Sequence, residues 1–493
     1  MKTLLGSALI CLCLAAPAFA QTSPAWRGHA GDEQHNAQAP AAGQKLAKLH
    51  WNTRIDLQPS AYIHYGSPML TAANTILFPV KTTAMGGFQI EARDGGSGTL
   101  LWQADTKYIV PPTADWVPSF PAHLTAQNRL YYADQGGTVR FRDKPDARKG
   151  PKGQLAFFGI ANYQAHPKPY NTNVMIDTPI TADDAGDIFF GFVVMGKTPL
   201  KLQSGIARIG ADGTGTWISA AKAANDSDIT QVAMNSAPAI SRDQTTIYIG
   251  VSNGTNGYLV GLDSTTLQPK YQAQLTDPAT GQAAVVTDLS SAAPTIGPDN
   301  DVYYGVLESP ATSHNCRGWL LHFDAGLDTT KIPGSFGWDD TVSVVPASIV
   351  PSYRGTSAYL VMTKYNNYLG CGLGDGRNRI AILDPDASQQ DQYSKAQVMK
   401  EVLTILSPAN VPGQRKSATY EWCINSAVVD VANKSVIANA EDGYSYRWDL
   451  ATNKLSEKLN LNPPTSEAYT PTLIGPDGTV YAINDGVLYA IGN

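Results

Sequence analysis

The sequence contains little of what proteins that bind nucleic acid or cross a membrane require. Charged residues make up only 16% of the chain and the formal net charge is -6, so there is no excess of cations to bind phosphates or an anionic surface. No stretch approaches the roughly 20 apolar residues of a membrane-spanning helix. We therefore expect neither nucleic acid as a partner nor insertion into a membrane.

Cysteine and histidine are also scarce, at 5 and 8 residues. The histidines are dispersed, without the spacing of a metal site or of a hydrolase signature. Beyond residue 20 only Cys316, Cys371 and Cys423 remain, and an odd number in an oxidising compartment predicts one disulfide and one spare thiol. A zinc site is the alternative, but these cysteines lack a short ligand pair.

The first twenty residues are typical of a cleaved signal peptide. Lys2 supplies the positive start, residues 4–15 are apolar, and Ala18-Phe19-Ala20 is a small-x-small cleavage site. Neither cysteine in this segment follows a small residue, as a lipid-attachment site would require. We expect a mature chain of residues 21–493 that is periplasmic or secreted.

Glycine, proline and tyrosine are abundant, with 44, 32 and 23 residues, which is typical of short strands joined by tight turns. A phrase of small residues, often with proline, that ends in a bulky aliphatic residue recurs about every 58 residues and precedes a turn and a β-rich run. The eight copies are Ser67–Leu70, Pro121–Leu124, Thr178–Ile180, Ala237–Ile240, Ala293–Ile296, Pro346–Ile349, Ser426–Val429 and Thr470–Leu473. Each copy predicts a meander of strands.

This period predicts an all-β chain that forms a single eight-bladed β-propeller with four antiparallel strands in each blade. Seven blades is the alternative, because the seventh copy lacks proline. The last copy ends after its third strand, residues 487–491, whereas residues 46–57 are strand-like and have no blade of their own. We predict that this N-terminal strand closes the ring as the outer strand of the last blade; a free arm is the alternative.

One segment of the first unit carries a recognisable motif. Ala92, Asp94, Gly98 and Trp102 have the spacing A-x-D-x-x-x-G-x-x-x-W. This resembles the docking motif of propellers with PQQ-like repeats, and the resemblance implies that the tryptophan packs between blades while the aspartate and glycine shape the turn. The third unit repeats the spacing with Ile209 in place of the aspartate, and later units keep only Asp263, Asp324, Asp384 and Asp449.

The resemblance implies a fold but leaves the activity open. Its family includes dehydrogenases that hold pyrroloquinoline quinone (PQQ) and calcium, and cofactor-free scaffolds of outer-membrane assembly. The chain has neither the adjacent cysteine pair of many such dehydrogenases nor a c-type haem motif. We therefore expect no cofactor, with PQQ and calcium as the alternative.

Candidate binding residues are expected where the entries to the first strands and the loops between second and third strands converge on the channel mouth. They are Lys81, Asn235, Lys364, Tyr365, Asn366, Asn367, Glu421 and Asn425. Asparagines, lysines, carboxylates and aromatic rings suit a small molecule, a glycan or a protein ligand. We expect Lys364 to face Glu421, and Asn366 and Asn425 to fix hydroxyls or a metal. Turn capping, packing and solvation are the plain structural alternatives.

One further expectation follows from the predicted order of blades. Cys371 and Cys423 fall on one face of adjacent blades, so we predict that they form the disulfide.

The leading interpretation is a ligand-binding or scaffolding protein of the cell envelope, and the alternative is a PQQ- and calcium-dependent oxidoreductase. A polysaccharide lyase is the second alternative, with Tyr365 beside Lys364, or His166 beside Lys168 and Tyr170, as base and cation.

Overall fold

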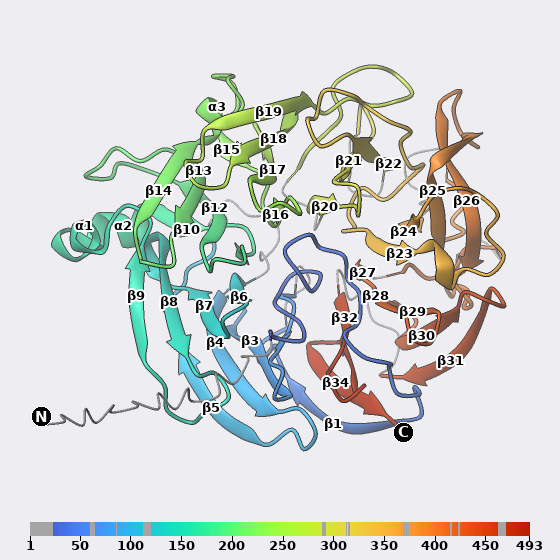
Figure 1. Ribbon diagram of the computed structural model, residues 1–493, viewed down its shortest axis with the longest axis horizontal. Coiled ribbons are helices and arrows are strands. Elements are labelled where there is room, and N and C mark those ends of the chain that lie inside the picture. Colours follow the sequence, from blue (N-terminus) through green and yellow to red (C-terminus); the bar gives the residue numbers. More distant parts are fainter. Residues whose placement is uncertain are drawn as a thin grey trace, which may run out of the picture.

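The computed structural model describes residues 23–59, 65–84, 86–111, 120–287, 292–311, 313, 316–365, 367, 374–414, 417–422, 424–461 and 470–493. Eight sheets stand around a central axis in chain order (Figure 1). The prediction of an eight-bladed β-propeller is confirmed, and the seven-bladed alternative is wrong. The expected signal peptide and the cysteines Cys371 and Cys423 lie outside the described residues.

The first four blades are meanders of antiparallel strands. Blade 1 consists of β2 (Met69–Leu70), β3 (Thr75–Thr83), β4 (Gly86–Asp94) and β5 (Leu100–Asp105), and blade 2 of β6 (Ala122–Leu124), β7 (Arg129–Ala133), β8 (Thr138–Asp143) and β9 (Lys152–Ala156). Blade 3 consists of β10 (Val174–Ile176), β11 (Thr181–Ala182), β12 (Ile188–Val194), β13 (Gly205–Ile209) and β14 (Gly215–Ser219). Blade 4 consists of β15 (Gln231–Val232), β16 (Ala239–Ile240), β17 (Thr246–Ser252), β18 (Gly257–Asp263) and β19 (Pro269–Gln274).

The other four blades are less uniform. Blade 5 has three strands, β20 (Thr295–Ile296), β21 (Val302–Leu307) and β22 (Gly318–Phe323), and blade 6 has β23 (Ser343–Pro346), β24 (Tyr359–Tyr365), β25 (Arg379–Gln390) and β26 (Gln397–Leu406). Blade 7 has β28 (Val428–Asp430), β29 (Ser435–Ala440), β30 (Tyr444–Asp449) and β31 (Lys454–Asn460). Blade 8 has β27 (Ile424–Ser426), β32 (Thr470–Ile474), β33 (Val480–Asn484), β34 (Val487–Gly492) and β1 (Lys48–Arg54).

Helical elements are short and lie in the connections. They are α1 (Ile160–Ala165), α2 (Pro167–Asn173), α3 (Ala220–Ala223) and the 3-10 turns η1 (Gln135–Gly137) and η2 (Ala347–Ile349). The element η2 corrects one prediction. The sixth repeat, Pro346–Ile349, was expected to form the inner strand of blade 6, but that strand is Ser343–Pro346 and the residues after it form the 3-10 turn. The valines at 344 and 345 are stronger strand formers than the alanine and serine that follow. No helix in the described part is long and apolar enough to cross a membrane.

The two faces of the ring differ in the connections that they carry. The face with the turns between first and second and between third and fourth strands is called the turn face below. The opposite face carries the loops between second and third strands and the connections between blades, and is called the loop face. The repeated aspartates stabilise the turn face: Asp94 accepts hydrogen bonds from the amide and hydroxyl of Ser97, and Asp263 and Asp449 accept amide hydrogen bonds in the same way.

The docking tryptophan lies between blades, as the motif implies. Trp102 donates from Nε1 to the carbonyl of Pro145 at 2.6 Å, and the guanidinium of Arg142 lies 4.0 Å above its ring. Gly98 adopts φ 70°, a conformation that favours glycine, directly against the ring of Trp51. Tyrosines of the second strands link other neighbouring blades: Tyr248 donates to the carbonyl of Ala325, and Tyr303 is hydrogen-bonded to Tyr359.

The N-terminal strand closes the ring. Strand β1 pairs antiparallel with β34 and supplies the outer strand that the last blade lacks, as predicted, and the alternative of a free arm is wrong (Figure 1). The pairing runs from Lys48 opposite Gly492 to Arg54 opposite Val487. It covers the backbone groups of an otherwise open sheet edge.

Residues 26–39 cover strand edges on the inside of the ring, as β1 does on the outside. The sequence did not predict this. The segment runs through the centre of the ring in Figure 1 and makes backbone hydrogen bonds to the innermost strands of six blades. The amides of Leu70, Leu124, Ile240, Ile296, Val344 and Val429 donate to carbonyls of this segment at 2.8–3.0 Å. Five of these six residues are the aliphatic positions of the repeat. We call residues 26–39 the plug.

Polar side chains place the plug toward the turn face. Arg27 forms an ion pair with Asp184 and Gln244 donates to Glu33, and both partners belong to turns between first and second strands. Asp32 accepts from the amides of Gln34 and Asn36 and so holds the plug in its bent course. The plug thus reaches the turn face through Arg27 and Glu33, while its His29 is hydrogen-bonded to Thr341 at the entry to blade 6.

Removal of residues 21–57 is expected to produce an aggregating protein. The truncation would expose β34 on the outside and the inner strands of six blades, and unpaired strand edges template intermolecular pairing. Light scattering coupled to size-exclusion chromatography measures this, with a chain that lacks only residues 21–24 as the control. A monomeric truncated protein with an unchanged melting temperature would contradict the prediction.

Candidate functional site

The predicted site residues gather at the loop-face end of the channel, but they are not exposed there. Lys81, Lys364, Asn235, Asn367 and Asn425 are each at most 2% exposed, and Tyr365 is also buried. Asn366 lies outside the described residues. Burial excludes the alternative that these side chains are simply solvated, and the contacts below show what holds them; ligand binding by them stays a prediction.

Lys81 holds the end of the N-terminal segment against blade 1. Its ammonium lies 3.0 Å from Asp56 Oδ1, and both side chains are buried. It also donates to the carbonyls of Gln58, Thr83 and Ala84. Because each ammonium proton has a protein acceptor, Lys81 stabilises the closure of the ring rather than binding a ligand.

Lys364 forms a second buried ion pair, and its partner is not the one predicted. Its ammonium lies 3.1 Å from Asp339 Oδ1, with both side chains 3% exposed, and no ion pair joins it to Glu421. The neighbouring Asp340 accepts from the amide of Lys364. Burial raises the pKa of Asp340 to about 8, so this carboxyl is protonated at neutral pH.

Thr341 and Asn425 connect the plug to four blades. Thr341 Oγ1 is hydrogen-bonded to His29 Nε2 at 3.0 Å and accepts from the amide of Ala293 at 3.1 Å. The amide of Thr341 donates to the carbonyl of Asn425, whose side chain donates to the carbonyl of Tyr65 at 3.3 Å. These bonds tie the entries of blades 1, 5, 6 and 8 together.

The segment around Tyr365 is part of an aromatic cluster. The ring of Tyr365 lies 4.5 Å from that of Phe336, and Phe336 contacts Tyr393. The buried guanidinium of Arg317 lies 5.0 Å from the Phe336 ring and binds Asp391 through both oxygens. Asn367 completes the cluster by donating to Tyr393 and Asp375, so the bonding of this segment is internal.

Asn235 and Glu421 have backbone roles. Asn235 adopts φ 64°, which asparagine tolerates better than most residues, and its amide donates to the carbonyl of Asp177. The carbonyl of Glu421 accepts from the amide of Glu441 at 3.0 Å. Both contacts fix the entries to inner strands, as the structural alternative proposed.

The two arrangements considered for a lyase are not assembled. Lys364 and Tyr365 are consecutive in β24, so their side chains point to opposite faces of the blade. His166 is exposed between α1 and α2, whereas Tyr170 is buried with its ring stacked on Phe158 at 4.3 Å. Neither pair places a base beside a cation at a common site.

The alternative of PQQ with calcium depends on whether oxygen ligands converge at one place. Calcium requires six to eight oxygen ligands, and no group of three acidic, histidine or cysteine side chains in the described part could hold a metal. Asp339 is already neutralised by Lys364, and the amide of Asn425 is engaged with Tyr65 and Ser426.

Cys316 is buried and disulfide-bonded. The sequence alone assigned no role to Cys316. Its partner lies outside the described residues, as do Cys371 and Cys423. With three cysteines in the expected mature chain, a bond at Cys316 is incompatible with a Cys371–Cys423 pair.

Three buried histidines line the inside of the ring near the plug. His29 and His35 belong to the plug with their rings 5.1 Å apart, and His123 faces Gly28. Burial lowers the pKa of His35 to about 4 and that of His123 to about 3, and it lowers the pKa of His29 well below its usual range. All three side chains are therefore neutral at physiological pH.

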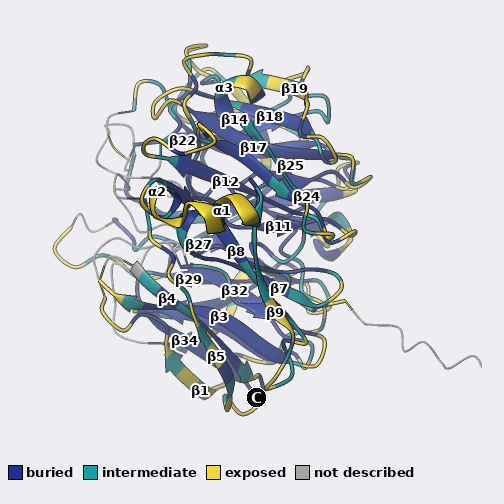
Figure 2. Cartoon of the chain, turned by 90° about the vertical axis from the view of Figure 1, so that its left-hand side faces the viewer, coloured by how far each residue is buried: buried dark blue, intermediate teal, exposed yellow. Residues whose placement is uncertain are grey.

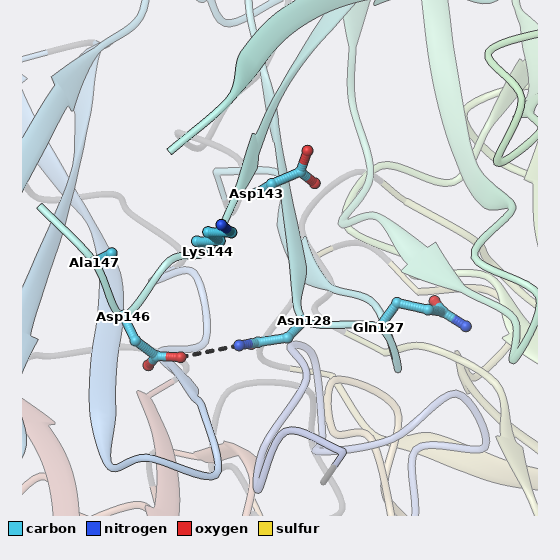
Figure 3. Close-up of a pocket in the computed structure, with 6 residues that line it drawn as sticks. All are labelled: Gln127, Asn128, Asp143, Lys144, Asp146 and Ala147. Carbon is cyan, nitrogen blue, oxygen red and sulfur yellow. Dashed lines mark hydrogen bonds between the residues drawn. The ribbon is translucent and has the colours of Figure 1, made fainter. Parts of the chain in front are cut away.

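Two recesses open among the described residues at the surface. A pocket of about 350 Å³ on the turn face is lined by Gln127, Asn128, Asp143, Lys144, Asp146 and Ala147 (Figure 3). Its carboxylates are engaged, since Asp146 accepts from Asn128 and Thr71, and Asp143 is paired with Arg129. A groove of about 610 Å³ lies beside α2 and is lined by Ile109, Val110, Pro167, Lys168, Asn171, Thr172 and Met175.

Comparisons with known proteins support the fold alone. No family model matches the sequence, and no curated protein matches it. A europium-containing methanol dehydrogenase aligns with a TM-score of 0.59 and 9% identity over 93% of this chain and 89% of its own. The quinohemoprotein alcohol dehydrogenase of Comamonas testosteroni aligns with a TM-score of 0.57 and 11% identity over 96% and 81%. BamB of Moraxella catarrhalis aligns with a TM-score of 0.44 and 12% identity over 85% and 92%.

The two dehydrogenases, which align with TM-scores above 0.5, support the propeller fold that the docking motif implied. At 9–12% identity the likeness carries no activity to this chain.

Replacement of Lys364 with methionine is expected to lower the free energy of unfolding by about 3–5 kcal/mol, because it leaves a carboxylate buried without its cation. Adding Asp339→Asn should restore at least half of the loss. Urea denaturation measures both, with Lys395→Met at an exposed position of the same blade as the control. An effect of Lys364→Met below about 0.5 kcal/mol would show that the side chain is solvated after all.

The melting temperature is expected to fall as the pH drops from about 6.5 toward 4. His35 has a folded pKa below its unfolded value of about 6.5, so the unfolded chain takes up a proton first and stability is lost over this interval. His35→Asn should flatten the decline, because asparagine can donate to the carbonyl of Pro294 as Nδ1 does and tolerates the φ of 63°. The exposed His166→Asn is the control, and an unchanged slope for His35→Asn would contradict the prediction.

Proposed function

We propose that the chain is a non-catalytic binding or scaffolding propeller of the cell envelope, exported to the periplasm or the exterior. The observation that supports this most is the plug, which lies inside the ring and is bonded to the innermost strands of six blades. A propeller filled in this way presents its loop face to a partner rather than a reaction chamber along its axis.

The bonding of the buried polar residues supports the same proposal. Lys81 forms an ion pair with Asp56, and Lys364 forms one with Asp339. The side chains of Thr341 and Asn425 are hydrogen-bonded to backbone groups of neighbouring blades. Such a network stabilises the ring and fixes the positions of the surrounding loops. The loops then act as a rigid platform, and among the ligand classes expected from the sequence a protein suits an open face best.

Site-specific photo-crosslinking in the native host tests the proposal. A photoreactive residue at Leu200, Thr255 or Gln414 on the loop face is expected to form discrete high-mass adducts, whereas one at Asp212 or Thr265 on the turn face is not. Purified protein supplied with PQQ and calcium should not reduce a redox dye. Dye reduction, or the absence of adducts at all three loop-face positions, would overturn the proposal.

A further inference from the structure

Exposed apolar side chains occur in the groove beside α2 and in a neighbouring connection of the loop face. The exposed large apolar side chains of the described part include Ile109, Met195 and Leu200, at 49%, 39% and 44% exposure. These three come from two connections separated by more than eighty residues in the sequence. Ile109 lines the groove, and the connection that carries the other two is hydrogen-bonded to Asn173 at the end of α2.

Specific contacts hold both connections against α2 and blade 3. Tyr108 donates to the carbonyl of Ile176 at 2.5 Å, which fixes the segment that carries Ile109. The amide of Met195 donates to the carbonyl of Asn173 at 2.8 Å, and the side chain of Asn173 donates to the carbonyl of Lys197 at 3.0 Å. Hydrogen bonds therefore fix the backbone of both connections that carry these exposed apolar side chains.

Several exposed lysines belong to the segments that form or contact this groove. Lys168 lines it, the carbonyl of Lys197 accepts from Asn173 at the end of α2, and Lys107 and Lys201 lie in the same two connections. No aspartate or glutamate occurs in residues 106–111, 157–176 or 194–204, and none of these four lysines forms an ion pair with a residue that the structure describes. A chain with a formal charge of -6 thus presents exposed cations beside an apolar recess.

We propose that the α2 groove, defined as the recess lined by Ile109, Val110, Pro167, Lys168, Asn171, Thr172 and Met175, docks an acidic segment of a protein partner. One apolar side chain of that segment enters the groove, and its flanking carboxylates face the lysines. This inference rests on the proposed function and names the chemical class of its partner.

The shape of the site favours a peptide over a membrane surface. The groove of about 610 Å³ is concave, and its apolar residues line and border a recess instead of projecting as an anchor. Figure 2 shows α1 and α2 as exposed helices on the outside of the ring, where an extended segment can approach. Buried apolar contact supplies most of the affinity, while the lysines steer association and select against basic segments.

Fluorescence anisotropy with labelled synthetic peptides tests this proposal on the full mature chain. The probe is a short peptide of glutamates around two leucines, with a serine-for-leucine and a lysine-for-glutamate peptide as comparisons. We expect the intact protein to bind the first peptide at least about tenfold more tightly than either comparison, and binding to weaken as salt is raised. Vesicles of anionic phospholipid serve as a separate probe.

Variants beside the α2 groove make the test specific. Met195→Ser with Leu200→Ser, and Lys197→Glu with Lys201→Glu, should each weaken peptide binding about tenfold while the melting temperature stays within a few degrees, because these positions are exposed. Lys395→Glu with Lys454→Glu, exposed lysines of blades 6 and 7, is the matched control and should leave binding unchanged.

Two outcomes would overturn the inference. One is peptide binding that the variants beside the groove do not change, and the other is binding to anionic vesicles without binding to the acidic peptide. Adducts from Thr255 or Gln414 in the crosslinking experiment, without binding at the α2 groove, would leave the proposed function standing and remove only this inference.

Discussion

Backbone hydrogen bonds between the plug and the innermost strands are the constraint on which the rest of the structure depends. Those strands are only two to four residues long in most blades, and each presents one open edge to the channel. A buried amide or carbonyl without a partner costs about 1–3 kcal/mol, so six open edges could not be tolerated in a dry channel. The plug satisfies them with its own backbone, and the repeat positions that donate are aliphatic, which keeps water out of the same seam.

The blades could be predicted from the sequence because the recurring aliphatic residues of the repeat are the ones buried near the axis of the ring. Each repeat places its aliphatic residue in or beside an inner strand, and the motif around Asp94 and Trp102 specifies a turn and an interblade contact through local spacing. The closing strand at 48–54 was predictable for a related reason, since the last blade lacked an outer strand. The plug has no period. It adopts left-handed conformations at Ala30, His35 and Ala37, which no local preference indicates.

The burial of the two candidate lysines could not be predicted, because it depends on a partner that the sequence does not reveal. Lysine is ordinarily solvated, so an exposed position was the reasonable expectation for Lys81 and Lys364. Each is instead buried against an aspartate 25 residues away along the chain, Asp56 and Asp339 respectively. The basic character of the α2 groove, by contrast, could have been predicted from the sequence. Residues 157–176 and 194–204, which enter the third blade and join its second and third strands, contain lysines but no acidic residue.

The closure by β1 also dictates the order in which the molecule can be completed. Residues 26–54 leave the ribosome early, yet their partners include β28 and β34, which lie in the last two blades. Blades in between can form as local meanders, but the ring cannot lock until the end of the chain arrives, because these contacts span nearly the whole sequence. For that interval the N-terminal segment and the inner edges are exposed to other chains, so successful folding depends on how the segment is protected from them.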